Sequence, residues 1–143
     1  MSVRLILESK GREVATIDPS ATLGSAVKVL AERRIGALVS VGESGTVIGI
    51  LSERDIVRRI AEDGASCLDE PVATAMTRNV KTAHEDMTID EAMDVMTQNR
   101  FRHLPVTEGG RLVGIVSIGD VVKRRIETVE REAEDLRSYI HAG

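Results

Sequence analysis

Two short motifs combine residue types that can bind a sugar or a phosphate. Ser52 and Asp55 follow one apolar run, and Ser117 and Asp120 follow a second run after the same Gly-Ile step. At this spacing the serine and the acid can form a capping box where a helix begins. They can also bind a ligand, because a carboxylate accepts two hydroxyls, as in a ribose diol, and a helix N-terminus attracts phosphate. Both interpretations stay open, since one residue can cap and bind.

A further cluster places cationic side chains where an apolar run begins. It spans residues 100–106, and Arg102 and His103 are expected to point towards a cleft or its rim. Arginine can hold a phosphate bidentately and histidine can add a donor. The alternative is a solvated strand end with ordinary ion pairs. The first copy has small and apolar residues at the equivalent positions 35–38, so we expect one flat, apolar half-site and one cationic half-site.

The elements that must position these residues occur twice. Apolar residues at helical spacing over residues 23–30 and 89–96 each predict a helix, and hairpins are expected around residues 42–45 and 108–110. Residues 14–17 are predicted to form a short strand. One such β-α-β-β-α unit is too small to bury a full core. We therefore predict an α/β (α+β) fold of two repeats about a pseudo-twofold axis, with a ligand cleft between them.

Three segments lie outside these units. Residues 3–7 predict a loose helix, and residues 62–74 predict an irregular connector in which Cys67 is a surface thiol or a small filler. Beyond Asp120 a long helix is expected. Its apolar residues follow a heptad-like spacing: Ile126, Val129, Ala133, Leu136 and Ile140. This helix either docks on its own core or contacts a partner chain, and we favour the partner.

Composition argues against several classes of function. The net charge is −4, and Phe101 and Tyr139 are the only aromatic residues, so neither a basic nucleic-acid surface nor an aromatic platform is expected. The single cysteine and three scattered histidines indicate neither a disulfide nor a metal site. No apolar run reaches the ~18 residues of a membrane span. We expect a cytoplasmic protein without membrane contact and, since no catalytic motif occurs, no enzyme activity.

Taken together, these motifs resemble a tandem pair of CBS domains, the modules named after cystathionine β-synthase, of the stand-alone bacterial type. The resemblance rests on the duplicated unit, the two Gly-Ile-x-Ser-x-x-Asp motifs and residues 35–38, 80–82 and 102–106. It implies a first CBS domain at residues 8–66 and a second at residues 75–132. It also implies that a C-terminal helix at residues 127–143 makes a homodimer contact.

The resemblance further implies a regulatory module that senses an adenosyl ligand (AMP, ADP, ATP, NAD(H) or S-adenosylmethionine) without catalysis or a required cofactor. The regulated protein is unknown. The implied ligand residues are Asp55 and Asp120 for ribose, Ser52 and Ser117 for ribose and phosphate, Arg54 and Arg102 for phosphate charge, and Thr16, Ile17, Ile35, Gly36, Ala37, Thr82, Ala83, Arg102, His103 and Leu104 for adenine. Ile118-Gly119 replaces Glu53-Arg54, which argues against a phosphate contact there. The alternative is a protein-interaction or dimerisation module without a nucleotide ligand.

Overall fold

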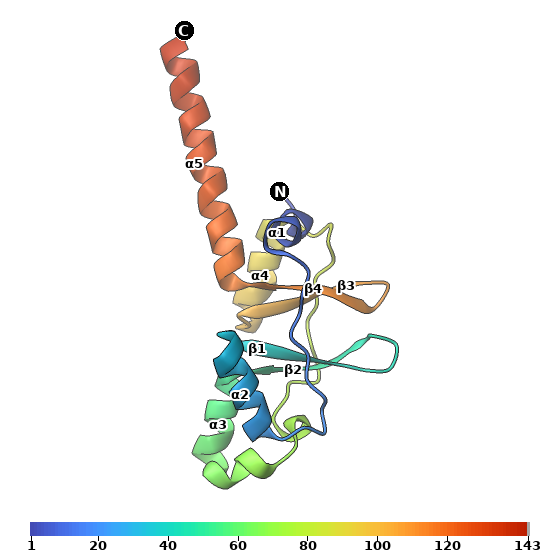
Figure 1. The fold of residues 1–143 in the computed structure, drawn as a ribbon. Coiled ribbons are helices and arrows are strands. Elements are labelled where there is room, and N and C mark those ends of the chain that lie inside the picture. The colour runs from blue at the N-terminus through green and yellow to red at the C-terminus, as the bar shows by residue number, and fades with distance from the viewer. Residues whose placement is uncertain (143) are drawn as a thin grey trace.

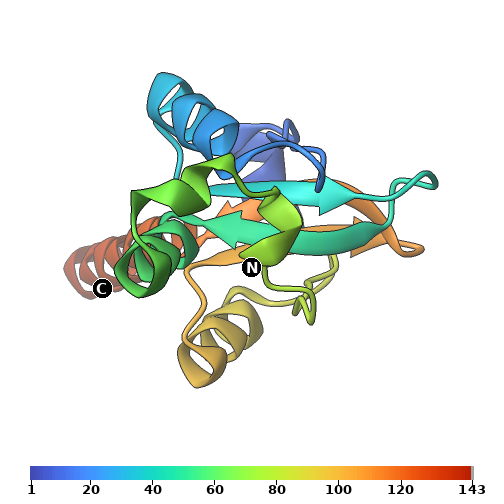
Figure 2. The same ribbon diagram turned by 90° about the horizontal axis from the view of Figure 1, so that it is seen from below.

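Each copy of the repeated unit forms an antiparallel hairpin, and the two hairpins lie side by side in the middle of the molecule (Figure 1, Figure 2). The computed structural model describes residues 1–142. In it β1 (Ala37–Val41) pairs with β2 (Val47–Ser52), and β3 (His103–Glu108) pairs with β4 (Arg111–Ser117). A register shift interrupts both ladders at matching positions. The predicted fold class is therefore confirmed.

Apolar side chains hold the two hairpins together. Ala37, Val39 and Ile50 are buried at this contact, and Leu112 and Ile115 pack against them from the second copy. At the hairpin ends the Leu112 N–H donates to the Gly45 carbonyl at 2.9 Å. The contact brings the beginning of β1 close to the beginning of β3, which matters for the site below.

The predicted strand at residues 14–17 shrinks to a single parallel bridge between Thr16 and Val39. The Ile17 N–H donates to the Val39 carbonyl at 3.0 Å, and the Val39 N–H donates to the Ala15 carbonyl at 3.1 Å. A turn follows at once, where Asp18 accepts hydrogen bonds from the Ser20 N–H and hydroxyl. The segment is too short to be a regular strand because this turn ends it.

Each hairpin follows a helix that ends in an unusual way. α2 (Leu23–Arg33) and α4 (Ile89–Asn99) both stop at an arginine in the left-handed conformation, with φ 53° for Arg34 and φ 57° for Arg100. Glycine is the usual residue at such a position, since a Cβ is disfavoured there. The reversal places each arginine just before the strand start that faces the other repeat.

Two further segments complete the cores. α1 (Val3–Lys10) confirms the predicted N-terminal helix, and its Val3, Ile6 and Leu7 are buried in the core of the second repeat. The connector was predicted to be irregular, but it forms the short 3-10 helices η1 (Ala65–Asp69) and η2 (Val72–Thr74). Cys67 is fully buried there and is therefore a filler.

Met76, which follows the connector, packs against the first repeat. A Cβ on Gly49 would lie 2.5 Å from the sulfur of Met76, and a Cβ on Gly114 would lie 2.7 Å from Leu7. β2 and β4 thus each have a glycine at the point where a side chain from outside the repeat packs against the strand. Leu7 of α1 thus packs against Gly114 in the second copy in the same way as Met76 packs against Gly49 in the first.

The last helix, α5 (Ile118–Ala142), leaves the body of the molecule (Figure 1). Its first turn packs on the second core through Val121, whereas Ile126, Leu136 and Ile140 are 52%, 60% and 64% exposed, so the part of the helix beyond Ile126 does not dock on its own core as one interpretation proposed. Gly143, the last residue of the predicted C-terminal segment, lies outside the described residues. Over residues 1–142, no helix combines the length and the apolar character that a bilayer span requires.

Candidate ligand site between the repeats

Two cavities open between the repeats, and both copies contribute to each. The larger cavity, of about 710 Å³, joins Ser52 and Asp55 of the first copy to residues 99–103 of the second. The smaller, of about 480 Å³, joins Ser117 of the second copy to residues 33–37 of the first. The arrangement is crosswise, because the acid of one copy lies beside the strand start of the other. We call these the Asp55 half-site and the Asp120 half-site.

Asp55 is held at the beginning of α3 (Glu53–Asp63) by a reciprocal capping box. Its Oδ2 accepts the Ser52 N–H at 2.9 Å and the Ser52 hydroxyl at 3.0 Å. In return the Asp55 N–H donates to the Ser52 hydroxyl oxygen at 3.2 Å. The capping interpretation of this motif is confirmed. The box also fixes the carboxylate at the wall of a cavity, where it is only half-buried and able to accept a ligand.

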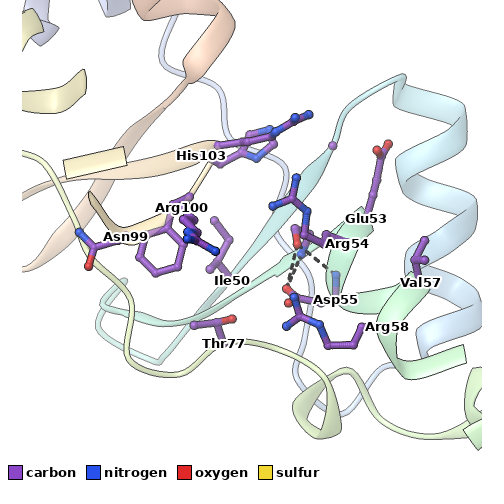
Figure 3. A pocket seen from close by; sticks show the side chains of 14 residues that line it. Ile50, Glu53, Arg54, Asp55, Val57, Arg58, Thr77, Asn99, Arg100 and His103 are labelled. Carbon is purple, nitrogen blue, oxygen red and sulfur yellow. Dashed lines mark hydrogen bonds between the residues drawn. The ribbon is translucent and has the colours of Figure 1, made fainter. Parts of the chain in front are cut away.

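Basic side chains outnumber acids in the Asp55 half-site (Figure 3). The basic residues are Arg54, Arg58, Arg100, Arg102 and His103, and the acids are Glu53 and Asp55. Arg54 and Arg58 come from α3, whereas the others surround the left-handed turn that ends α4. A group that carries negative charge is the natural occupant, because guanidinium groups hold phosphate or carboxylate bidentately.

The Asp120 half-site contains the same box and one additional partner. The Ser117 N–H donates to Asp120 Oδ2 at 2.8 Å, and the Asp120 N–H donates to the Ser117 hydroxyl oxygen at 3.1 Å. Lys10, at the end of α1, also donates from its Nζ to Asp120 Oδ2 at 2.7 Å and to the Ile115 carbonyl at 3.0 Å. A lysine from a distant segment thus completes this site.

The charge state of Asp120 reflects these contacts. Burial raises the pKa of this carboxyl, but the hydrogen bonds from Lys10 and the Ser117 N–H, with the charge of Lys10, act in the other direction. The net effect holds the pKa below its ordinary value. Asp120 is therefore an anion at neutral pH, and Lys10 already neutralises it.

Gly36 and His103 line both cavities and form their shared wall. A Cβ on Gly36 would lie 3.1 Å from His103 Cε1, so any other residue at this position would require the imidazole to move by a few tenths of an ångström. Burial lowers the pKa of His103, and Lys10 and Arg102 lower it further against the opposing effect of Glu53 and Asp120. The imidazole is consequently neutral at pH 7 and offers one donor and one acceptor.

The structure brings together most of the site residues expected from sequence. The expected residues that line a cavity are Ile35, Gly36, Ala37, Ser52, Arg54, Asp55, Arg102, His103 and Ser117. Asp120 joins them through Ser117 and Lys10. Ala83 and Leu104 instead bury their side chains in the second core, and Thr16, Ile17 and Thr82 lie outside the lining of both cavities within residues 1–142.

The expectation of one flat, apolar half-site is wrong, because Lys10, Arg33 and Arg34 line the smaller cavity. Sequence reasoning also missed Arg58 in the larger one, and it included Arg100 only as the first residue of the 100–106 cluster, without a role at the ligand. Arg34 and Arg100 are identical residues at matching points of the repeat, which is a signal that could have found them. Lys10 had no such signal, since it lies outside the repeat.

The described part of the chain holds no cluster of three or more histidine, cysteine, aspartate or glutamate side chains arranged for a metal ion. The half-sites offer anchored carboxylates, guanidinium groups and helix N-termini around a cavity, and such groups can bind hydroxyls and anions.

Comparison with models of protein families identifies the family of this chain. The model of the CBS domain matches the chain twice, over residues 10–62 and 72–127. The chain belongs to the CBS domain family. The two matches coincide with the two repeats, so the tandem organisation is confirmed, while the exact bounds 8–66 and 75–132 stay a prediction.

Relatives of this CBS pair are found among plant and bacterial proteins. The mitochondrial CBS domain-containing protein CBSX3 of Arabidopsis thaliana is 36% identical over 148 residues, covering 96% of this chain and 71% of the relative. The crystal structure of a CBS-domain containing protein from Agrobacterium tumefaciens is 46% identical, with a TM-score of 0.84, and covers 87% of this chain and 99% of that one.

A second similar structure contains ligands. The CBS domain pair of the protein MJ0100, solved in complex with 5′-methylthioadenosine and S-adenosyl-L-methionine, is 29% identical with a TM-score of 0.79. The alignment covers 90% of this chain and 98% of that one.

Proposed function

We propose that this CBS pair is a regulatory module that binds an adenosyl nucleotide in the Asp55 half-site and performs no catalysis. The observation that carries the proposal is the position of Asp55, a carboxylate fixed by its own helix start at the wall of a cavity rich in arginine. Among residues 1–142, the hydrogen bonds to this carboxylate all fall on Oδ2, so Oδ1 is available to ribose hydroxyls. The adenosyl ligands of the MJ0100 pair support the choice of ligand class.

The charges of the half-site favour ligands that carry phosphate. Arg54, Arg58 and Arg100 surround a cavity large enough for a nucleotide, and α3 presents its N-terminus to the same space. AMP, ADP, ATP and NAD(H) fit this environment better than S-adenosylmethionine, whose sulfonium is cationic. The ligand state would then be passed on to a regulated protein.

Calorimetric titration with AMP, ATP, NADH and S-adenosylmethionine tests the proposal. In Asp55→Asn the loss of a charge-assisted hydrogen bond to ribose should weaken AMP binding by roughly 10- to 150-fold. Glu62→Gln is the matched control, because it removes one charge from an exposed position of the same helix outside the cavity. Equal affinities for wild type and Asp55→Asn, or no binding of any of the four compounds at millimolar concentration, would refute the proposal.

A second candidate function, protein interaction, rests on α5. Ile126, Val129, Leu136 and Ile140 form an exposed apolar seam between charged residues of both signs. We propose that the seam pairs with α5 of a second copy, because its heptad-like spacing and mixed flanking charges make it self-complementary. The homodimer would hold two nucleotide modules together.

Light scattering after gel filtration distinguishes the states of α5. Wild type should elute as a dimer, and Leu136→Glu should elute as a monomer because a charge would lie within the seam. Ser138→Glu adds the same charge outside the seam and should remain dimeric. A monomeric wild type, or a dimeric Leu136→Glu variant, contradicts this role.

A further inference from the structure

Lys10 distinguishes the two half-sites more than any other side chain. Its Nζ donates to Asp120 Oδ2 at 2.7 Å and to the Ile115 carbonyl at 3.0 Å. The helix that carries this lysine is anchored, because Leu7 of α1 is buried in the second core. The Val3 N–H also donates to the Met87 carbonyl at 2.9 Å. The backbone that carries Lys10 is thus anchored, and its side chain, which is 34% exposed, places the ammonium group in the Asp120 half-site.

The corresponding position of the first repeat is satisfied by backbone instead. Ile50 is the counterpart of Ile115 in the repeat. The Thr77 N–H donates to the Ile50 carbonyl at 2.8 Å, and the Ile50 N–H donates to the Thr77 carbonyl at 3.0 Å. A neutral chain segment thus pairs with this strand, whereas in the second repeat a cationic side chain reaches over the strand and on to the acid.

A ribose at Asp120 has to compete with this contact. An ammonium forms a charge-assisted hydrogen bond with a carboxylate, which is stronger than the bond from a neutral hydroxyl. Displacing Lys10 also removes the donor that the Ile115 carbonyl has in this structure, so that water has to take its place. Arginines line the Asp55 half-site, but among the described residues none of them is hydrogen-bonded to or paired with Asp55, whose carboxylate accepts only from Ser52.

We propose that Lys10 determines which half-site binds a ribose. It closes the Asp120 half-site by occupying the sugar-binding acid, so that the ligand enters the Asp55 half-site, and the second position fills only when Lys10 is displaced. This inference rests on the proposed function, because the ribose belongs to the adenosyl ligand assigned there.

Titration with 5′-methylthioadenosine tests the inference, because this ligand is uncharged and does not respond to a lost phosphate contact. Wild type should bind one equivalent. Lys10→Met keeps the apolar stem but removes the ammonium, and it should bind a second equivalent at least roughly 10-fold more tightly than wild type. The double variant Lys10→Met/Asp120→Asn should return to one. Arg12→Met is the matched control, since Arg12 lies near the same helix end but pairs with Glu85.

A second measurement needs no ligand. Carbodiimide-coupled labelling with glycine ethyl ester, read by peptide mass spectrometry, reports how accessible each carboxylate is. Labelling of Asp120 relative to Asp55 should rise in Lys10→Met and stay unchanged in Arg12→Met. Two equivalents in wild type, one equivalent in Lys10→Met, or unchanged labelling of Asp120 in Lys10→Met would each overturn the inference. If labelling of Asp120 rises in Lys10→Met but no variant binds 5′-methylthioadenosine, the proposed function is refuted. The same result would still show that Lys10 covers Asp120.

Discussion

The Asp55 and Asp120 half-sites start from the same motif and differ in what surrounds it. Both acids cap a helix through a serine three residues earlier. Around Asp55 the arginines lie across the cavity, whereas at Asp120 a lysine already touches the carboxylate. Duplication therefore preserved the anchoring of the acid and changed its availability. The comparison teaches that a repeated motif predicts a repeated geometry, but that neighbours from outside the repeat decide what each copy can bind.

The largest effect is expected where α1 enters the second core. Leu7 is 1% exposed and packs against Gly114, so Leu7→Ala should lower the free energy of unfolding by about 2–5 kcal/mol. Loosening α1 should also release Lys10 and make the two half-sites more alike. Urea denaturation measures the loss, and Val57→Ala, at a 66% exposed position, should change stability by less than about 0.5 kcal/mol. A loss as small as that of the control would show that α1 contributes little.

An exchange of residues at the helix starts sharpens the comparison of ligand charge. Arg54→Gly gives the first copy the residue that Gly119 provides in the second. Loss of one guanidinium near the phosphate should weaken AMP binding by roughly 10-fold, while 5′-methylthioadenosine should bind as before. Calorimetry with both ligands measures the difference. An equal loss for both would mean that Arg54 shapes the cavity and does not contact phosphate.

The smallest effect concerns stability in acid. The pKa of Asp120 is lowered in the folded protein, so its pairing with Lys10 stabilises the fold above the ordinary value of 3.8 and is lost as the pH falls through the folded pKa. Because both side chains are partly exposed, the contribution should stay below about 1 kcal/mol. Lys10→Met should therefore be slightly less stable than wild type at pH 7, and the difference should be smaller at pH 3. Urea midpoints at both pH values provide the measurement, and a difference that grows in acid would reverse the assigned sign.

Sequence reasoning reached the parts of this molecule that the repeat encodes. The hairpins, the helices and both Ser-x-x-Asp boxes follow from apolar spacing and from identical residues at matching positions. The chain alone did not reveal the crosswise pairing, because periodicity says nothing about which copy faces which. Residues 99–103 lie beside Asp55 only because the hairpins pack at Val39, Ile50 and Ile115.

The remaining errors have a common physical origin in contacts between segments distant in sequence. Residues 65–74 show no periodicity, yet they form 3-10 turns because Val72 is buried in the core of the first repeat. Ala83 and Leu104 were expected at the ligand because the resemblance matches backbone positions; their side chains are buried in the second core, so a contact through their backbone stays a prediction. A motif comparison fixes where the chain runs and leaves open which way a side chain points.

The attachment of α1 to the far repeat has a consequence for how the protein is made. α1 is synthesised before the core that receives Val3, Ile6 and Leu7, because that core consists of residues from Ala83 to Val121. Its apolar face must therefore stay uncovered, or be shielded by a chaperone, until the residues up to Val121 have been synthesised. A fragment beginning at β3 would lack these three side chains, so the C-terminal half of the polypeptide cannot be excised as a self-sufficient unit.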